Sequence, residues 1–200
     1  MSFRIEEKIL IEKTEVMRFL NQYSNNLKKI YDTRTINSIY FDDKYLSSHI
    51  DGEEGSIPRK KTRVRFYNHI NTNKTFFLEK KISSVEGRYK TSKEIDSDKF
   101  TKMTKNGVIC NMYGQIFPKA IVSYKRSYFK LKDVRLTIDE DIKYSKYQMN
   151  NKVKYLYDDI CVIELKADYL TNIDYLKNLI PVRRSRFSKY SRACNMLELN

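Results

Sequence analysis

The chain has 200 residues, of which 40% are hydrophobic and 13% aromatic, with only 5 Gly and 3 Pro. This composition excludes a flexible linker or a low-complexity chain and is typical of one folded domain with its own core. The formal net charge of +14 arises from 39 Lys+Arg against 25 Asp+Glu. It points to an anionic partner, namely nucleic acid, a membrane surface or a phosphate-rich compound; a lysine-rich, solvated surface with no partner is the alternative.

The first half of the chain combines alternating strand patterns with one helical pattern. In chain order, the predicted elements are a strand over 3–11, a helix from Thr14 with apolar spacing as far as Leu27, a strand over 34–42, a loop over 47–58 closed by Pro58, and strands over 61–69 and 75–82 joined by a turn at 71–73. The spacing of the last two strands predicts a hairpin.

The second half repeats the strand pattern with fewer helices. The predicted elements are a polar stretch over 84–93 that contains Gly87, a short helix over 96–106 ended by Gly107, strands over 119–129, 134–142 and 160–167, and a helix over 172–180 with Thr171 as its cap and Pro181 as its stop. About seven or eight strands, mostly arranged as hairpins, predict an α+β fold that is mainly antiparallel β.

The cysteines and the apolar segments indicate where the protein resides. Cys110, Cys161 and Cys194 are far apart and form no CxxC motif, so we expect reduced thiols and a cytoplasmic location. The opening MSFRIEEKILIEK has no apolar region of the kind that a signal peptide needs. No run approaches the ~20 apolar residues of a spanning helix, so we expect no transmembrane segment, although the protein could associate with a membrane protein partner.

The stretch RKKTRVRFY, residues 59–67, gathers cations on one face of a strand. Lys61, Arg63 and Arg65 lie two residues apart, and successive side chains of a strand point to opposite faces. Three other strands carry a carboxylate two residues before a lysine. These pairs are Glu6/Lys8, Glu79/Lys81 and Glu164/Lys166. For any single strand, a solvated polar face is the simpler interpretation.

Taken together, the polar faces carry more cations than carboxylates. The cations are Arg4, Lys8, Arg63, Arg65, Lys81, Arg126, Arg135 and Lys166, and the carboxylates are Glu6, Glu79, Asp139 and Glu164. If these faces converge inside a closed or nearly closed barrel, the unpaired charges cost several kcal/mol each unless an anion compensates them. A triphosphate or polyphosphate has a suitable charge density, and the carboxylates could then hold Mg²⁺ or Mn²⁺.

Eight short motifs also follow one another along the chain. They are FRIEEKILI at 3–11, SIYFDD at 38–43, R-x-R at Arg63 and Arg65, E-x-K at Glu79 and Lys81, Y-x-R at Tyr124 and Arg126, R-x-T-x-D within VRLTID at 134–139, E-x-K at Glu164 and Lys166, and S-K-Y at 188–190. Each motif alone is a weak signal, but eight in order are specific. Through them, nearly the whole chain resembles the VTC domain, the polyphosphate-polymerase branch of the CYTH-like triphosphate tunnel metalloenzymes.

The resemblance implies a fold and an activity. The fold would be a closed or nearly closed eight-stranded antiparallel β-barrel tunnel with helices packed outside, as a single domain over residues 1–200. The activity would be that of a polyphosphate polymerase, which transfers the γ-phosphoryl group of ATP onto a growing polyphosphate chain with Mn²⁺ or Mg²⁺ as cofactor. Arg4 stands where the broader superfamily has the first Glu of E-x-E-x-K. This departure favours the polymerase branch and leaves fewer acids to hold metal.

The resemblance also implies residue roles. The catalytic group would be Arg63, Arg65, Lys81, Arg126, Glu164 and Lys189; the substrate-binding group would be Arg4, Lys8, Tyr124, Arg135, Lys166 and Ser188; and the metal would be held by Glu164, with Glu6 and Glu79 as helpers. Guanidinium groups suit bidentate phosphate contacts, whereas lysine acts as a point charge.

Each role has a structural alternative. Arg63 and Arg65 could form a solvated face, and Glu164 could pair only with Lys166 or a neighbouring arginine. Glu6 and Glu79 could merely orient nearby cations. Of the remaining candidates, we interpret Lys61, Arg88 and Lys90 as surface charges, His49 and His69 as solvated, and Cys161 as a core residue.

Other functions fit the same residues. A tripolyphosphatase or nucleoside triphosphatase could use the same tunnel, and a non-catalytic module could bind polyphosphate or inositol phosphates there. No nucleic-acid-binding motif is found, so we expect ATP and polyphosphate, and no nucleic acid, as partners.

Overall fold

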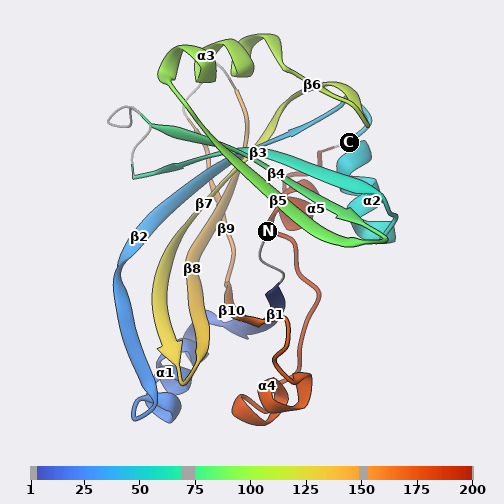
Figure 1. Ribbon diagram of the computed structural model, residues 1–200. Coiled ribbons are helices and arrows are strands. Elements are labelled where there is room, and N and C mark those ends of the chain that lie inside the picture. The colour runs from blue at the N-terminus through green and yellow to red at the C-terminus, as the bar shows by residue number, and fades with distance from the viewer. Residues whose placement is uncertain (1–3, 69–74, 149–152, 200) are drawn as a thin grey trace. The chain divides into compact units, whose positions relative to one another are not determined.

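The computed structural model describes residues 4–68, 75–148 and 153–199. Its strands are β1 (Arg4–Glu12), β2 (Leu27–Asp42), β3 (Arg59–Tyr67), β4 (Phe76–Ser84), β5 (Gly87–Ile95), β6 (Val108–Cys110), β7 (Gly114–Leu131), β8 (Val134–Lys146), β9 (Leu156–Tyr157) and β10 (Ile160–Asp168) (Figure 1). Its helices are η1 (Lys13–Glu15, a 3₁₀ turn), α1 (Val16–Tyr23), α2 (Ser47–Glu54), α3 (Ser97–Asn106), α4 (Ile173–Leu179) and α5 (Lys189–Met196). His69, the predicted turn at 71–73 and the side chain of Arg4 lie outside the described part.

Backbone hydrogen bonds join eight strands in the order β1-β10-β8-β7-β2-β3-β4-β5, with β6 beside β7 and β9 beside β8. The pairs with a defined register are antiparallel, as the hairpin pattern predicts. The α+β class with a mainly antiparallel sheet is therefore confirmed. Within the described residues the path has two ends, β1 and β5, so closure into a barrel is not confirmed.

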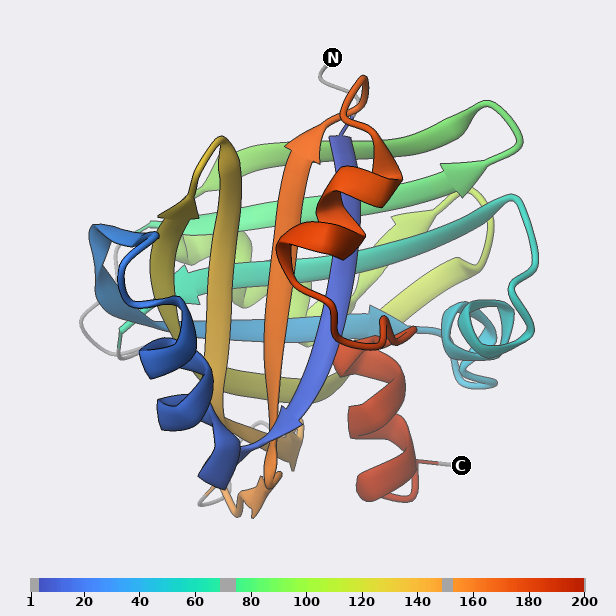
Figure 2. The same cartoon turned by 90° about the horizontal axis from the view of Figure 1, so that it is seen from below.

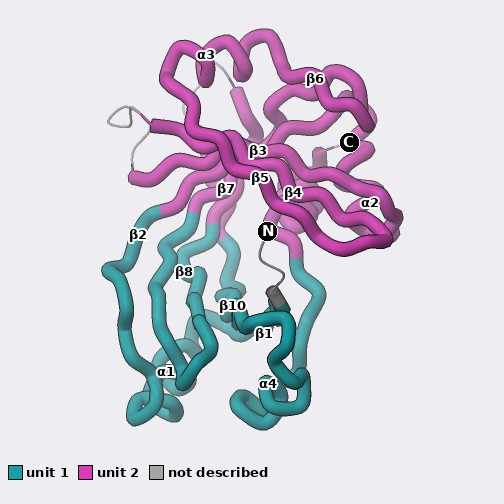
Figure 3. Tube along the Cα trace, in the orientation of Figure 1, with its two compact units in different colours: residues 1–35, 124–142, 158–187 teal, residues 36–123, 143–157, 188–200 magenta. Residues whose placement is uncertain are grey.

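The chain forms two compact units, which Figure 3 shows in different colours. Unit 1 comprises residues 1–35, 124–142 and 158–187, and unit 2 comprises residues 36–123, 143–157 and 188–200. The long strands β2, β7 and β8 contribute residues to both units. The single domain over residues 1–200 stays a prediction, and each unit is described here by itself.

Unit 1 has a core on one face of its strands. Figure 2 shows α1 and α4 lying over this face. Phe19 of α1 and Leu176 of α4 pack in one cluster with Ile9 of β1 and Ile163 of β10, and all four are at most 7% exposed. Because side chains alternate along a strand, the opposite face of β1 and β10 carries Glu6, Lys8, Glu164 and Lys166.

Unit 2 also buries one face of its sheet, here beneath α3. Val64, Phe66 and Phe76 cluster with Phe100 and Met103 of α3. The rings of Phe76 and Phe100 stack with centroids 4.1 Å apart. Asp96 caps α3 by accepting a hydrogen bond from the Lys99 N–H. Gly107 ends the helix at φ 76°, as the sequence predicts. The opposite face of β3 and β4 is again the charged one.

The predicted loop over 47–58 is wrong, because residues 47–54 form α2. The polar composition hides this helix. Its first turn is held by two preceding carboxylates, since Asp43 accepts from Ser47 N–H and Asp42 accepts from the N–H groups of Ser48 and His49. Carboxylates at a helix N-terminus satisfy donors that lack an intrahelical partner.

Other boundaries also differ from the prediction. Leu27 begins β2 and is not part of the first helix, and Asn172, not Thr171, caps α4 through its side chain. The polar stretch that contains Gly87 forms β5, and α5 was not predicted. Strand β5 pairs with β4 along its whole length, so tertiary pairing outweighs its low content of strand-forming residues.

Two further expectations concern the state of the cysteines and the presence of a membrane-spanning helix. All three cysteines are buried and free. Cys161 belongs to the core of unit 1, as predicted, and burial raises the pKa of its thiol to about 11. Among the described residues, no helix combines the length and apolarity needed to cross a membrane.

Candidate functional site

The polar face of β3, β4 and β5 in unit 2 gathers cations from three adjacent strands. The register places Lys61 opposite Lys81, and Lys81 opposite Lys90. Residues directly opposite in an antiparallel pair share a face, and like charges there are destabilising. Arg63 and Arg65 continue the same face along β3. We call these five residues, Lys61, Arg63, Arg65, Lys81 and Lys90, the cationic face.

Glu79 of β4 is the carboxylate that three members of the cationic face contact. Its carboxylate oxygens lie 2.6 Å from Arg63 Nη2, 3.6 Å from Arg65 Nη1 and 2.6 Å from Lys90 Nζ. Burial alone would raise the pKa of Glu79, which is only 5% exposed. The positive charges of Arg63 and Arg65, together with Lys90, outweigh this effect and lower the pKa to about 2.

Two lysines of the cationic face, Lys61 and Lys90, have lowered pKa values. The pKa of Lys61 is lowered by burial, and Arg59 and Lys81 lower it further. Burial also lowers the pKa of Lys90, against the opposing effect of Glu79. An anion bound at this face would stabilise the charged form of these lysines and so raise their pKa values.

Helix α5 brings the S-K-Y motif to the cationic face. Ser188 is the N-cap of α5, and Lys61 Nζ donates a hydrogen bond of 2.8 Å to its Oγ. Tyr190 is buried, and its hydroxyl donates to Asp42 Oδ2 at 2.7 Å. The Tyr190 ring stacks on Tyr40 at 5.0 Å, and Tyr40 OH accepts a hydrogen bond from Arg63. These contacts fix where Ser188 and Lys189 lie.

The polar face of β1, β10, β8 and β7 in unit 1 has mixed charge. Arg126 donates two hydrogen bonds to Asp139, at 2.5 and 2.7 Å, and lies 3.3 Å from Glu164 Oε2. Asp139 is fully buried, and Arg126 and Glu164 are 9% and 8% exposed. Glu164 is thus held between Arg126 and Lys166, whose Nζ lies 3.5 Å from its Oε1.

The remaining predicted residues of unit 1 surround this buried group. Lys166 Nζ also contacts Glu6 Oε1 at 3.2 Å, Lys8 Nζ donates to the carbonyl oxygen of Phe187 at 2.6 Å, and Arg126 lies over the Tyr124 ring. Arg135 is exposed and opposes Lys166 in the register. We call Glu6, Lys8, Arg126, Arg135, Asp139, Glu164 and Lys166 the mixed-charge face.

The predicted residues are therefore assembled on two faces, one in each unit. A family model described as VTC domain matches residues 3–198. The chain belongs to the VTC domain family. The resemblance drawn from the eight motifs is confirmed.

Solved structures with a similar fold cover nearly the whole VTC domain. A structure described as a putative adenylate cyclase from Bacillus halodurans shares 12% identity with a TM-score of 0.60 and 94% of both chains covered. A conserved hypothetical protein from Pyrococcus furiosus shares 16% identity with a TM-score of 0.56, over 94% of this chain and 99% of that one. PH1012 from Pyrococcus horikoshii OT3 shares 11% identity with a TM-score of 0.57, over 94% and 98%. No curated protein matches the chain.

The carboxylates of this VTC domain fit a metal ion only in part. Within the described ranges, no three His, Cys, Asp or Glu side chains gather as a group that could hold a metal ion. Glu79 is already compensated by three cations. Glu164 and Glu6 share Lys166, and the buried hydroxyl of Thr137, opposite Glu164 in the register, makes no hydrogen bond with another described residue. Mg²⁺ commonly combines one or two carboxylates with substrate phosphates, and Glu164 with Glu6 suits that arrangement.

Two residues that we interpreted as surface charges contact residues of the predicted site. Lys61 contacts the N-cap of α5, and Lys90 contacts Glu79. Arg88 is exposed, as expected. His49 is half-buried, its Nδ1 is buried, and its ring lies edge-on to Tyr190, so the solvated interpretation is wrong. Lys61 lies on the same strand face as Arg63 and Arg65, as alternation along the strand predicts.

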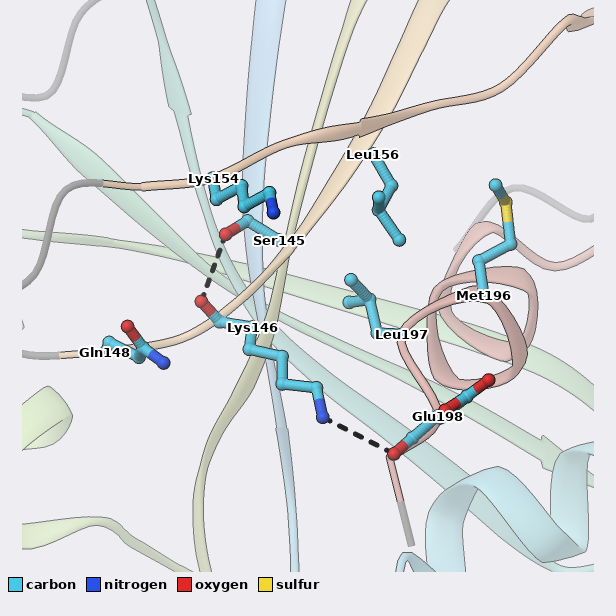
Figure 4. Close-up of a pocket in the computed structure, with 8 residues that line it drawn as sticks. All are labelled: Ser145, Lys146, Gln148, Lys154, Leu156, Met196, Leu197 and Glu198. Carbon is cyan, nitrogen blue, oxygen red and sulfur yellow. Dashed lines mark hydrogen bonds between the residues drawn. The ribbon is translucent and has the colours of Figure 1, made fainter.

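A pocket of about 410 Å³ lies elsewhere in unit 2 (Figure 4). Its wall combines Leu156, Met196 and Leu197 with Lys146, whose Nζ lies 3.5 Å from the carbonyl oxygen of Glu198. It shares no residue with the cationic face.

Proposed function

We propose that this VTC domain is a polyphosphate polymerase, which transfers the γ-phosphoryl group of ATP onto the end of a polyphosphate chain with Mn²⁺ or Mg²⁺. The observation that carries the proposal is the row of three lysines across β3, β4 and β5. Facing lysines on adjacent strands repel one another, and an anion bound over them would remove that cost. The family model supports the choice of a phosphate polymer over other anions.

The arginines would align the phosphates. Phosphoryl transfer requires in-line positioning and neutralisation of charge on the equatorial oxygens, with no protein nucleophile. Arg63 and Arg65 would bind phosphate oxygens in unit 2, where Glu79 and Tyr40 already fix the Arg63 guanidinium. Lys81 and Lys189 would each add a point charge. The terminal phosphate of the polymer would attack the γ-phosphorus of ATP in line.

Within the mixed-charge face, Asp139 would orient Arg126. The bidentate contact with Asp139 leaves the guanidinium fixed in a buried position, which suits bidentate binding of phosphate. Lys8, Lys166, Arg135, Tyr124 and Ser188 would contribute further phosphate contacts, as would Arg4. Glu164, helped by Glu6, would hold the metal, and the bound metal would neutralise phosphate charge. We assign Glu79 to the orientation of Arg63 and Lys90, not to metal binding.

The test combines ATP and Mn²⁺ with the protein and resolves the products on a gel stained for polyphosphate. We expect long chains from the native protein and roughly 10²-fold less polymer from Glu164→Gln, which keeps the shape of the side chain and removes its charge. Glu86→Gln, at an exposed turn position, is the matched control and should retain activity.

Other products would replace the proposal. Orthophosphate without polymer would indicate a tripolyphosphatase or nucleoside triphosphatase. Tight triphosphate binding without turnover would indicate a binding module for polyphosphate or inositol phosphates. Such a module needs no carboxylate for a metal, which agrees with the neutralisation of Glu79 by three cations. Equal polymer yield from native protein and Glu164→Gln would refute the role of Glu164.

A further inference from the structure

The first part of β2, in unit 1, carries exposed cationic and aromatic side chains to which the proposed function gives no role. Tyr31 is 55% exposed, and the Arg34 guanidinium lies over its ring, with Cζ 5.9 Å from the ring centroid. A pocket of about 490 Å³ lies along this stretch and is lined by Lys29, Ile30, Tyr31, Asp32 and Arg34. The Tyr31 ring is therefore accessible to a ligand, on a surface that also carries positive charge.

A second tyrosine ring connects Tyr31 to the mixed-charge face. Strands β2 and β7 are neighbours in the sheet (Figure 1), and the rings of Tyr31 and Tyr128 are nearly perpendicular, with centroids 5.8 Å apart. Arg135 of the mixed-charge face lies over the Tyr128 ring, with Cζ 5.7 Å from its centroid. We call Arg34, Tyr31, Tyr128 and Arg135 the aromatic row, and all four belong to unit 1.

The aromatic row has the chemistry that binds a nucleotide base. Stacking of a base on an aromatic side chain contributes about 1 to 3 kcal/mol, and a guanidinium group adds a planar, charged neighbour. A phosphate chain has no ring to stack, so an exposed tyrosine at this position favours the nucleotide over the polymer. A base is also small enough for a pocket of this volume.

The position of the row fits the phosphates that the proposed function already assigns. Arg135 opposes Lys166 in the register, and both were assigned to phosphate contacts. Tyr31 is two contacts away from Arg135, through the Tyr128 ring. The base of a nucleotide therefore reaches Tyr31 while its phosphates remain beside the cations of the mixed-charge face.

We propose that Tyr31, with Arg34 beside it, stacks the purine base of a nucleoside triphosphate whose phosphates lie on the mixed-charge face. The inference rests on the proposed function and identifies what binds the part of the substrate that is not phosphate. Tyr128 is a positioning residue, because its perpendicular contact, at 88°, restricts rotation of the Tyr31 ring. A ring that is fixed in advance loses less conformational freedom when the base binds.

The first test uses fluorescence, because the chain contains no tryptophan. Tyr31→Trp places a single indole at the stacking position, and we expect ATP to quench its emission in a saturable way. Inorganic tripolyphosphate, which has no base, should not quench it. Tyr157→Trp is the matched control, since Tyr157 of β9 in unit 2 is 68% exposed and its ring centroid lies 5.8 Å from Lys143 Nζ. Its emission should respond to neither ligand.

The second test is calorimetric titration of the full chain with ATP and, separately, with tripolyphosphate, in EDTA so that no phosphoryl group is transferred. Tyr31→Ala should raise the Kd for ATP roughly 5- to 50-fold, because one stacked base is lost, and should leave the Kd for tripolyphosphate unchanged. Tyr31→Phe keeps the ring and should bind ATP like the native protein. Because Tyr31 is exposed, both variants should melt close to the native temperature.

Different results overturn the inference and the proposed function. If Tyr31→Ala binds ATP as tightly as the native protein does, or if both ligands quench Tyr31→Trp equally, no base lies on Tyr31 while the proposed function stands. If Tyr31→Ala loses affinity for both ligands to the same extent, Tyr31 serves the phosphates and not a base. Quenching by ATP without polymer formation would keep the base site and remove the proposed function. If the native protein binds neither ligand, both proposals fail.

Discussion

Glu79 stabilises the fold through its charge. Its pKa is about 2 in the folded chain, against an ordinary value of 4.5. At 1.36 kcal/mol per pKa unit, the folded state gains on the order of 3 kcal/mol from the ionised carboxylate. Because the folded pKa is the lower one, this contribution is fully present above pH 4.5 and is lost as the pH falls towards 2.

Glu79→Gln should therefore lower the free energy of unfolding by about 3 kcal/mol at pH 7, and the difference from the native protein should shrink below pH 4.5. Urea unfolding at pH 7, 4 and 3 measures both effects. Glu94→Gln, at an exposed position of β5 that opposes Phe77, should change stability by less than about 0.5 kcal/mol. A difference that stays constant with pH would contradict the charge-based account.

At the scale of an element, a buried hydrogen bond and a ring stack hold α5 to β2. Tyr190 OH donates to Asp42, which is fully buried and also accepts from backbone N–H groups of α2. Tyr190→Phe keeps the ring stacked on Tyr40 and removes the donor. We expect a loss of about 1.5 to 3 kcal/mol in the free energy of unfolding, the range for a hydrogen bond to a charged group.

The matched control for this contact is Tyr175→Phe. Tyr175 OH donates to Asp133 at 2.6 Å in an exposed setting, so its removal should change stability little. Urea unfolding of both variants makes the comparison. Equal effects in the two variants would contradict the claim that burial of Asp42 makes the α5 contact strong.

The parts of this site that the sequence could predict are those governed by strand alternation. Alternation placed Arg63 and Arg65 on one face, and Glu164 with Lys166 on another, and the register agrees. The contact of Tyr190 with Asp42 joins residues 148 positions apart, and no local pattern encodes such a pair. Likewise, Lys90 joins Glu79 only because β5 pairs with β4 in one register, and register depends on the turn and on burial.

At the scale of the whole molecule, the net charge of +14 should couple stability to polyanions. A ligand that binds only the folded state at 100 times its Kd adds about 2.7 kcal/mol. For a chain of this length, sodium tripolyphosphate at that concentration should raise the melting temperature by roughly 5 to 10 °C. The increase should shrink in 0.5 M NaCl, because salt screens exposed charges.

Thermal unfolding with sodium sulfate at equal ionic strength is the control for this effect. Sulfate carries charge but cannot span several cations, so its shift should be smaller. An equal shift with sulfate, or a tripolyphosphate shift that NaCl leaves unchanged, would contradict binding along the cationic face.

The interleaving of the two units has a consequence for inheritance. The chain passes between them at 35–36, 123–124, 142–143, 157–158 and 187–188, and three of its strands supply residues to both. No single deletion or early stop can therefore remove one unit and spare the other. The mixed-charge face draws its residues from three separate stretches of unit 1, so no continuous piece of the chain can carry that face between genes without carrying parts of unit 2 as well.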